Sequence, residues 1–200
     1  EGQTSIVSPM VPERWTLLCR DAYNGILLWK KPLATWGMHA WRSKSLRHVV
    51  DFTGRRIVAA GDFLYVTLEY AGPLHELDGK TGAVVRKLAG TEGTQEVLLQ
   101  DDILFINRIN AGKENSVSYI QRSSGKTLWE TKTPKISLTT LASDGKIIAY
   151  FNGREIIGIN ALSGERKWAA SPDFAENKTK AKSKIADANA DANAVQKAKF

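Results

Sequence analysis

The sequence predicts an all-β protein in which one structural unit repeats along the chain. A nine-residue stretch recurs with a polar first residue, a glycine at the fifth position and, in three copies of four, a tryptophan at the ninth. The copies occupy residues 21–29, 78–86, 121–129 and 160–168. Their glycines lie 57, 43 and 39 residues apart. A period of this size indicates a repeat architecture.

Each copy is interpreted as a β-hairpin turn, because glycine supplies the positive φ that closes such turns and Asn, Ser or Thr precedes it. A second predicted hairpin lies upstream of each of the last three copies. Its arms are short and rich in β-branched and aromatic residues, as strands are. The predicted arms are 56–60 with 64–68, 97–99 with 103–106, and 138–142 with 147–151.

Two hairpins give four strands in a unit of about 40 residues, which is typical of a β-propeller blade. We therefore predict a β-propeller segment of about three and a half four-stranded blades, an incomplete ring completed by chain outside these residues. The predicted divisions are a loose leading segment (1–14), blades over 15–170 (a half blade at 15–30, then 56–88, 97–130 and 138–169), and an Ala/Lys/Asn-rich linker or marginal helix (171–200).

The repeat resembles the bacterial quinoprotein-type (PQQ-like) propeller repeat, with the signature Ala-x-Asp-x-x-Thr-Gly-x-x-x-Trp. Gly79-Lys80-Thr81-Gly82 and Ser163-Gly164-Glu165-Arg166-Lys167-Trp168 carry the match. The resemblance covers about residues 15–170 and implies a fold more than an activity, because this repeat also builds non-enzymatic scaffolds. It implies bound pyrroloquinoline quinone and calcium only for the family's enzymes. Their vicinal cysteine pair is missing, since Cys19 is the sole cysteine.

The repeated tryptophans have a structural interpretation. In such repeats the indole lies between adjacent blades and seals them, and replacing a core Trp by Ala typically costs about 3–5 kcal/mol. Arg86 stands where the second copy would have its tryptophan, so we expect that junction to be weaker or stacked differently. The expected blade seals are Trp29, Trp129 and Trp168.

The charge and the apolar content of the chain argue against some classes of binding partner. The net charge is +7, but residues 176–200 hold six Lys against three acidic residues and the remainder shows no dense basic stripe. We therefore expect no nucleic-acid partner. No segment approaches the roughly 18 apolar residues of a membrane span. The expected location is the periplasm or the outside of a bacterial cell, with no signal peptide visible in the sequence.

A candidate ligand-binding rim follows from the strand order. An antiparallel meander places both hairpin turns of each blade at one end and the remaining links at the other. The link 32–55 is far longer than the usual 4–6 or so residues. Its aromatic and guanidinium groups suit an anionic or aromatic ligand, or else the tryptophans pack the loop onto a blade. The candidate rim residues are Trp36, His39, Trp41, Arg42, Arg55, Arg56, Thr91, Glu92, Thr94 and Arg108.

No catalytic residue is assigned. His39, His48 and His75 do not have the spacing of a metal-binding motif. The leading hypothesis is a propeller module that acts as a binding or scaffold surface for a protein or small molecule, within a larger protein with further blades or a fused domain. The alternatives are a fragment of a PQQ-dependent oxidoreductase (alcohol or sugar dehydrogenase-like) and an accessory domain of a fused enzyme.

Overall fold

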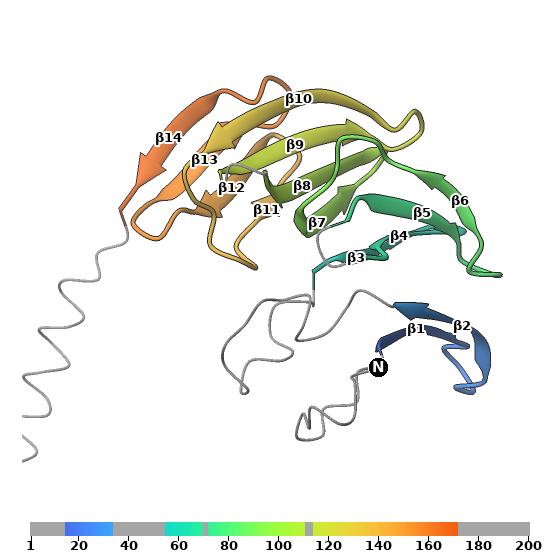
Figure 1. The fold of residues 1–200 in the computed structure, drawn as a ribbon. Helices are drawn as coiled ribbons and strands as arrows, with labels where there is room; N and C mark the ends of the chain where they lie inside the picture. Colours follow the sequence, from blue (N-terminus) through green and yellow to red (C-terminus); the bar gives the residue numbers. More distant parts are fainter. Residues whose placement is uncertain (1–14, 34–54, 70–71, 111–113, 172–200) are drawn as a thin grey trace, which may run out of the picture.

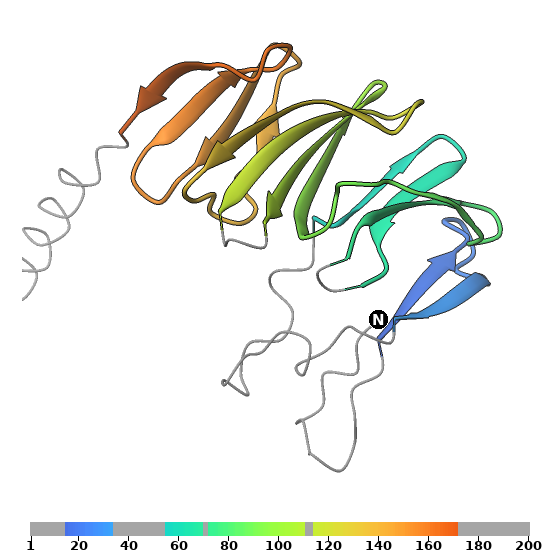
Figure 2. The same ribbon diagram turned by 45° about the horizontal axis from the view of Figure 1, so that its top comes forward.

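The computed structural model describes residues 15–33, 55–69, 72–110 and 114–171. These residues form strands and no helix, arranged as one two-stranded and three four-stranded sheets. The sheets stand side by side along an arc, with β1 and β2 at one end and β14 at the other (Figures 1 and 2). The predicted all-β propeller segment with an incomplete ring is confirmed. None of the described residues forms a helix long and apolar enough to cross a membrane.

Each four-stranded sheet is an antiparallel meander in chain order. The first sheet pairs β1 (Trp15–Arg20) with β2 (Leu27–Leu33). The second contains β3 (Ile57–Ala60), β4 (Phe63–Thr67), β5 (Leu74–Asp78) and β6 (Val84–Lys87). The third contains β7 (Thr94–Gln100), β8 (Ile103–Ile109), β9 (Asn115–Gln121) and β10 (Lys126–Thr133). The fourth contains β11 (Ala142–Ser143), β12 (Ile147–Phe151), β13 (Ile156–Asn160) and β14 (Arg166–Ala170).

The repeated stretch forms the same turn in all four copies. Its glycine has φ between 70° and 73° at Gly25, Gly82, Gly125 and Gly164. The N–H of each glycine donates to the carbonyl oxygen of the first residue of its copy, at 2.8–2.9 Å. A residue with a side chain rarely adopts this left-handed conformation, which explains why glycine stands at the fifth position.

The two turns of each four-stranded sheet lie together at one end of the arc. Backbone N–H groups of the second turn donate to carbonyl oxygens of the first: Gly79 to Asp62 (2.7 Å), Arg122 to Asp102 (2.7 Å) and Ala161 to Lys146 (2.8 Å). We name this end the turn end. The links between sheets and between middle strands lie at the other end, the loop end.

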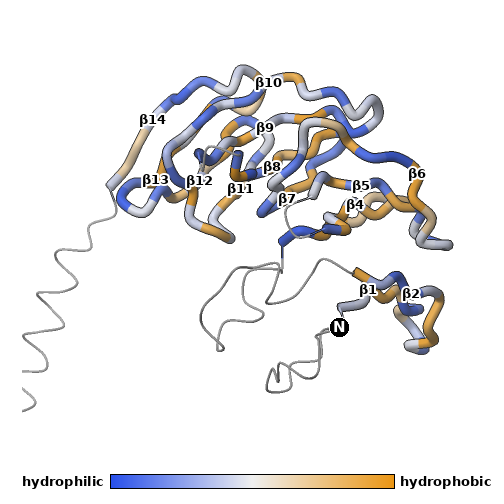
Figure 3. Tube along the Cα trace, viewed as in Figure 1, coloured by the Kyte–Doolittle hydropathy of each residue, from blue (hydrophilic) through white to orange (hydrophobic). Residues whose placement is uncertain are grey.

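The core consists of three apolar clusters, one at each joint between neighbouring sheets. Leu17 and Leu77 lie in the first cluster, Tyr65 and Val97 in the second, and Val117 with other residues in the third. Figure 3 shows hydrophobic stretches along strands such as β4 and β8 within the arc. A sheet inside the arc packs on both of its faces, so β9 is buried along almost its whole length, whereas β14 at the end of the arc is exposed throughout.

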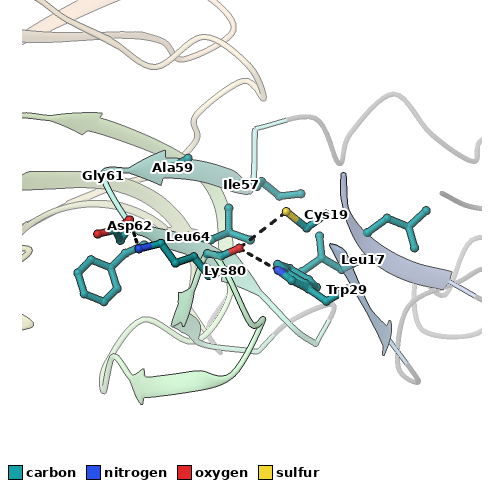
Figure 4. A pocket seen from close by; sticks show the side chains of 12 residues that line it. Leu17, Cys19, Trp29, Ile57, Ala59, Gly61, Asp62, Leu64 and Lys80 are labelled. Atoms are coloured by element: carbon teal, nitrogen blue, oxygen red, sulfur yellow. Dashed lines mark hydrogen bonds and ion pairs between the residues drawn. The ribbon is translucent and has the colours of Figure 1, made fainter. Parts of the chain in front are cut away.

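Tryptophans cross two of these joints. The indole N–H of Trp29 donates to the carbonyl oxygen of Gly79 in the next sheet at 2.9 Å, as Figure 4 shows. The indole N–H of Trp129 donates to the carbonyl oxygen of Ala161 at 3.0 Å. In both copies the acceptor is the second residue of the following repeat.

Arg86 occupies the equivalent position at the joint between the second and third sheets, and its acceptor Arg122 is again the second residue of the following repeat. Its guanidinium donates to the carbonyl oxygens of Arg122 and of Ser123, the latter at 3.0 Å. It also pairs with the carboxylate of Glu76 at 2.6 Å, and that carboxylate accepts the hydroxyl of Tyr65 at 3.1 Å. The pKa of Tyr65 is raised, mainly because the side chain is buried and next because of the negative charge of Glu76. The residue that crosses this joint is charged, whereas an aromatic residue crosses each of the other two.

The predicted strand over 138–142 is wrong for most of its length, because β11 contains only Ala142 and Ser143. Thr139 has a φ of 62°, and the hydroxyl of Thr140 donates to the carbonyl oxygen of Ser137 at 2.6 Å. The chain therefore turns here instead of extending. Segments 1–14, 34–54 and 172–200 lie outside the described residues, and the predicted domain limits stay predictions.

Candidate functional site

Arg55 connects three sheets at the loop end. It immediately precedes the β3 region, and its Nη1 donates to Glu96 Oε1 in β7 at 2.7 Å. The same nitrogen lies 2.9 Å from the carbonyl oxygen of Thr139 and 3.2 Å from that of Leu141, just before β11. The carbonyl oxygen of Arg55 accepts the N–H of Val97 at 2.7 Å. One residue thus links the first strands of the second, third and fourth sheets.

Glu96 is the buried member of this cluster, with its side chain 1% exposed. Burial raises its pKa, while the charge of Arg55 and the N–H of Leu141 act in the opposite direction. That N–H donates to Oε1 at 3.2 Å, whereas Oε2 is buried without a hydrogen-bond partner. A buried carboxylate is costly unless it is paired, so Arg55 stabilises Glu96 as well as the joint.

A cavity of about 290 Å³ lies beside Arg55, between β7 and β11. Ser143 closes part of it by donating its hydroxyl to Gln100 Oε1 at 3.0 Å. Its size lies near the lower limit of small-molecule sites, which is about 300 Å³. Guanidinium, amide and apolar groups together can orient a small polar molecule or a side chain of a partner. The lining residues are Arg55, Leu98, Leu99, Gln100, Phe105, Ala142 and Ser143.

A larger cavity of about 410 Å³ lies between the first sheet and β3 and β4 (Figure 4). Leu17, Cys19 and Ile57 contribute apolar walls, and Trp29 forms one side. Among the described residues the first sheet has two strands where the other sheets have four, and it lacks the pair that corresponds to β3 and β4. The cavity therefore opens beside β1. It is an apolar cleft without a charged cluster, apart from the pair between Lys80 and Asp62 at 3.2 Å.

The remaining predicted rim residues separate into two groups. Arg56 and the two threonines are buried. The hydroxyl of Thr91 donates to the carbonyl oxygen of Leu88, and that of Thr94 to the carbonyl oxygen of Thr91, both at 2.6 Å. These two hydrogen bonds fix the conformation of the link between the second and third sheets. Arg56 donates to Gln95 Oε1.

Glu92 and Arg108 complete the predicted set at the loop end. Glu92 is exposed on the same link as the threonines. Arg108 Nη2 lies 2.5 Å from Glu130 Oε2 within the third sheet. Burial acts to raise the pKa of Glu130, but bonds from Ser116 and Arg108 outweigh it and lower that pKa. Trp36, His39, Trp41 and Arg42 lie outside the described residues, and ligand binding by any of the ten stays a prediction.

Gln95 and Glu96 were not among the site residues predicted from the sequence. The signal for Glu96 is a carboxylate immediately before the apolar run Val97-Leu98-Leu99 at the start of a predicted strand. A charged residue in such a place requires a partner when the strand is buried. Identifying that partner as Arg55 requires the spatial arrangement, because the two residues are 41 positions apart.

A calcium ion, which accompanies the quinone in the family's enzymes, requires ligands that the cluster around Arg55 lacks. Calcium takes about six to eight oxygen ligands, commonly with several carboxylates. Glu96 supplies the carboxylate here, and it is already paired with a guanidinium. Within the ranges that the structure describes, no three His, Cys, Asp or Glu residues gather as a metal site. The residues around Arg55 do not fit the calcium ion that would accompany the quinone.

The fold places the protein in the class of β-propeller repeat proteins. The chain belongs to the family described as outer membrane protein assembly factor BamB, whose family model matches residues 13–197. No curated protein matches the chain.

Two solved structures show the same fold at low identity. BamB from Moraxella catarrhalis is 14% identical with a TM-score of 0.52, over 77% of this chain and 42% of that one. Sqt1 from Saccharomyces cerevisiae is 12% identical with a TM-score of 0.52, over 78% of this chain and 42% of that one. The matched part of this chain thus spans less than half of either relative.

Proposed function

We propose that this chain is a propeller module whose loop end binds a protein partner, so that the arc serves as a scaffold within a larger periplasmic or secreted bacterial protein. The family name, an assembly factor for outer membrane proteins, supports a protein partner and a place near the outer membrane. The alternative, in which the module binds a small molecule, is supported by the cavity beside Arg55.

The observation that carries this proposal is the arrangement of Arg55. Three acceptors from two other sheets hold its guanidinium, yet the side chain is still 38% exposed. A surface arginine that is already ordered loses little conformational entropy on binding, which favours its use in recognition. Exposed charged residues on neighbouring links, Glu92 and Arg154, extend the same end of the arc.

Site-specific photo-cross-linking in a bacterial periplasm tests the proposal. A photoreactive residue is placed at Glu92 or Arg154 at the loop end, and at Lys80 or Lys126 at the turn end as matched exposed controls. We expect one identified protein adduct from the loop-end positions and none from the turn end. Glu92→Lys should weaken the adduct formed from position 154. Equal adducts from both ends, or none from the loop end, would contradict the proposal.

A further inference from the structure

Arg55 bonds its neighbours through a single nitrogen of its guanidinium. Its Nη1 lies 2.7 Å from Glu96 Oε1, 2.9 Å from the carbonyl oxygen of Thr139 and 3.2 Å from that of Leu141. Among the described residues, no acceptor bonds to Nε or Nη2 of this side chain. These two nitrogens form an edge of the guanidinium that can bind both oxygens of a carboxylate at once. Arg55 is thus fixed in position and still has a pair of donors available.

Gln100 supplies a second donor to the cavity beside Arg55. Its Oε1 accepts the hydroxyl of Ser143 at 3.0 Å, and that hydroxyl accepts the N–H of Gly145 at 3.1 Å. The amide nitrogen of Gln100 has no acceptor within the ranges that the structure describes. A Cβ added to Gly145 would lie 2.5 Å from this nitrogen, so the turn packs against the amide and restricts its position. The cavity therefore has two ordered donor groups, a guanidinium and an amide, that lack an acceptor among these residues.

The rest of the cavity lining is largely apolar. Leu98 and Phe105 are cross-strand partners on β7 and β8, and Phe105 is buried. β11 contributes only Ala142 and Ser143, because the chain turns before it instead of extending. The short strand leaves a space of about 290 Å³ between the third and fourth sheets, lined by apolar side chains and by the two donor groups. This combination suits a ligand with one anionic group on a small hydrocarbon body.

We propose that this cavity binds a carboxylate that carries a small apolar body. The carboxylate accepts hydrogen bonds from Arg55 and from the amide of Gln100, while the body packs against Leu98 and Phe105. Arg55 is the one positively charged residue of the described lining, and Glu96 offsets part of its charge, which favours a singly charged carboxylate over a phosphate.

The carboxylate has two possible sources, a free small molecule and the C-terminus of a partner chain. This inference deepens the proposed function, and only the second source rests on that function. Isobutyrate is the probe for the first source. The peptide acetyl-Gly-Val with a free C-terminal carboxylate is the probe for the second, and the same peptide with a C-terminal amide is its control.

NMR titration of the 200-residue chain, labelled with nitrogen-15, is the test. We expect isobutyrate to shift the amide signals of Gln100 and Ser143 with a Kd on the order of 1 mM, as is ordinary for so small a ligand. Gln100→Glu keeps an oxygen for Ser143 but places a negative charge in the cavity, so it should weaken binding at least about tenfold. Glu96→Gln keeps an acceptor for Arg55 and removes a competing charge, so it should tighten binding about threefold. Lys126→Gln, at the exposed turn end, lowers the net charge as much as Gln100→Glu does and should change nothing.

The outcomes separate the site from its ligand source. Tighter binding of the peptide acid than of isobutyrate assigns the carboxylate to a chain terminus, and the reverse order assigns it to a free molecule; both uphold the site. No shift at Gln100 and Ser143 with either probe at about 20 mM, roughly twenty times the expected Kd, overturns the proposal. Equal binding of isobutyramide or of inorganic phosphate, or binding that survives Gln100→Glu in a variant whose spectrum shows it to be folded, does the same. Cross-linking from the loop-end positions is measured separately, so a failure here leaves the proposed partner binding standing.

Discussion

Trp129 and Ala161 join two sheets through one hydrogen bond, with the indole nitrogen 3.0 Å from the carbonyl oxygen. The indole also stacks on Tyr119 of its own sheet, with ring centroids 5.6 Å apart. On its other side it covers Gly164, the glycine of the next repeat turn. Apolar burial, aromatic stacking and a directed bond therefore coincide at a single side chain.

Trp129→Ala is expected to lower the free energy of unfolding by about 3–5 kcal/mol, because it empties this joint and removes its bond. Trp168→Ala is the matched variant at the end of the arc, where the side chain is 42% exposed. It should cost no more than about half as much. Urea unfolding of the two variants measures both losses. Equal losses would show that the joint does not carry the difference.

Gly164→Ala should destabilise the protein more than Gly25→Ala. Both glycines have φ near 73°, so each substitution costs about 1–2 kcal/mol of backbone strain. At Gly164 the new methyl group would also lie 2.8 Å from Trp129 and from Thr131, whereas at Gly25 it would meet nothing within 4 Å. Overpacking adds about 1–3 kcal/mol. Thermal unfolding of the two variants compares them directly, and a larger loss at Gly25 would contradict the joint geometry.

Arg86→Met is expected to cost about 3–5 kcal/mol, because it leaves the carboxylate of Glu76, which is 5% exposed, without its charged partner. Glu76 and Arg86 are cross-strand partners, as are Tyr119 and Trp129 in the next sheet. The aromatic pair of Tyr119 and Trp129 can therefore be introduced at the equivalent positions of Glu76 and Arg86.

We expect the double variant Glu76→Tyr with Arg86→Trp to be more stable than Arg86→Trp alone by at least about 1 kcal/mol. A double-mutant cycle in urea provides the coupling free energy. Additive effects of the two substitutions would show that the pair does not act as a unit at this joint.

Glu96 should make stability depend on pH. Burial raises its pKa in the folded protein above the value in the unfolded chain, about 4.3. Between the two values the folded state holds a proton that unfolding releases, so the free energy of unfolding falls as pH rises through that interval. Glu96→Gln keeps an acceptor for Arg55 and removes the titration. Unfolding measured from pH 4 upward should show a smaller fall for the variant, and parallel curves would refute the assignment.

The strand pattern and the recurring glycines were sufficient to predict the sheets and their order. Local chemistry explains this success, because every copy of the repeated stretch has a glycine with positive φ, and in three of the four the first side chain accepts bonds from nearby N–H groups. The strand over 138–142 was predicted wrongly because its apolar Leu138 and Leu141 suggest extension. A left-handed Thr139 and a bond from Leu141 to Glu96 override that local preference.

The candidate site was only partly predictable. Arg55 and Arg56 were selected because they follow a long basic link, and the structure brings them to Glu96 and Gln95. No pattern along the chain pairs residues about 40 positions apart in different sheets, since such pairs depend on how the sheets pack.

The sequence by itself determined the repeat, the β-hairpin turns and the all-β arc, because these rest on interactions within a few residues of one another. The tertiary structure alone decided that Arg86 replaces an indole by bonding two carbonyl groups, that Arg55 bridges three sheets, and that Trp168 and Gly25 contact no neighbouring sheet among the described residues. Those contacts form between sheets, where the relative placement of whole elements determines which side chains meet.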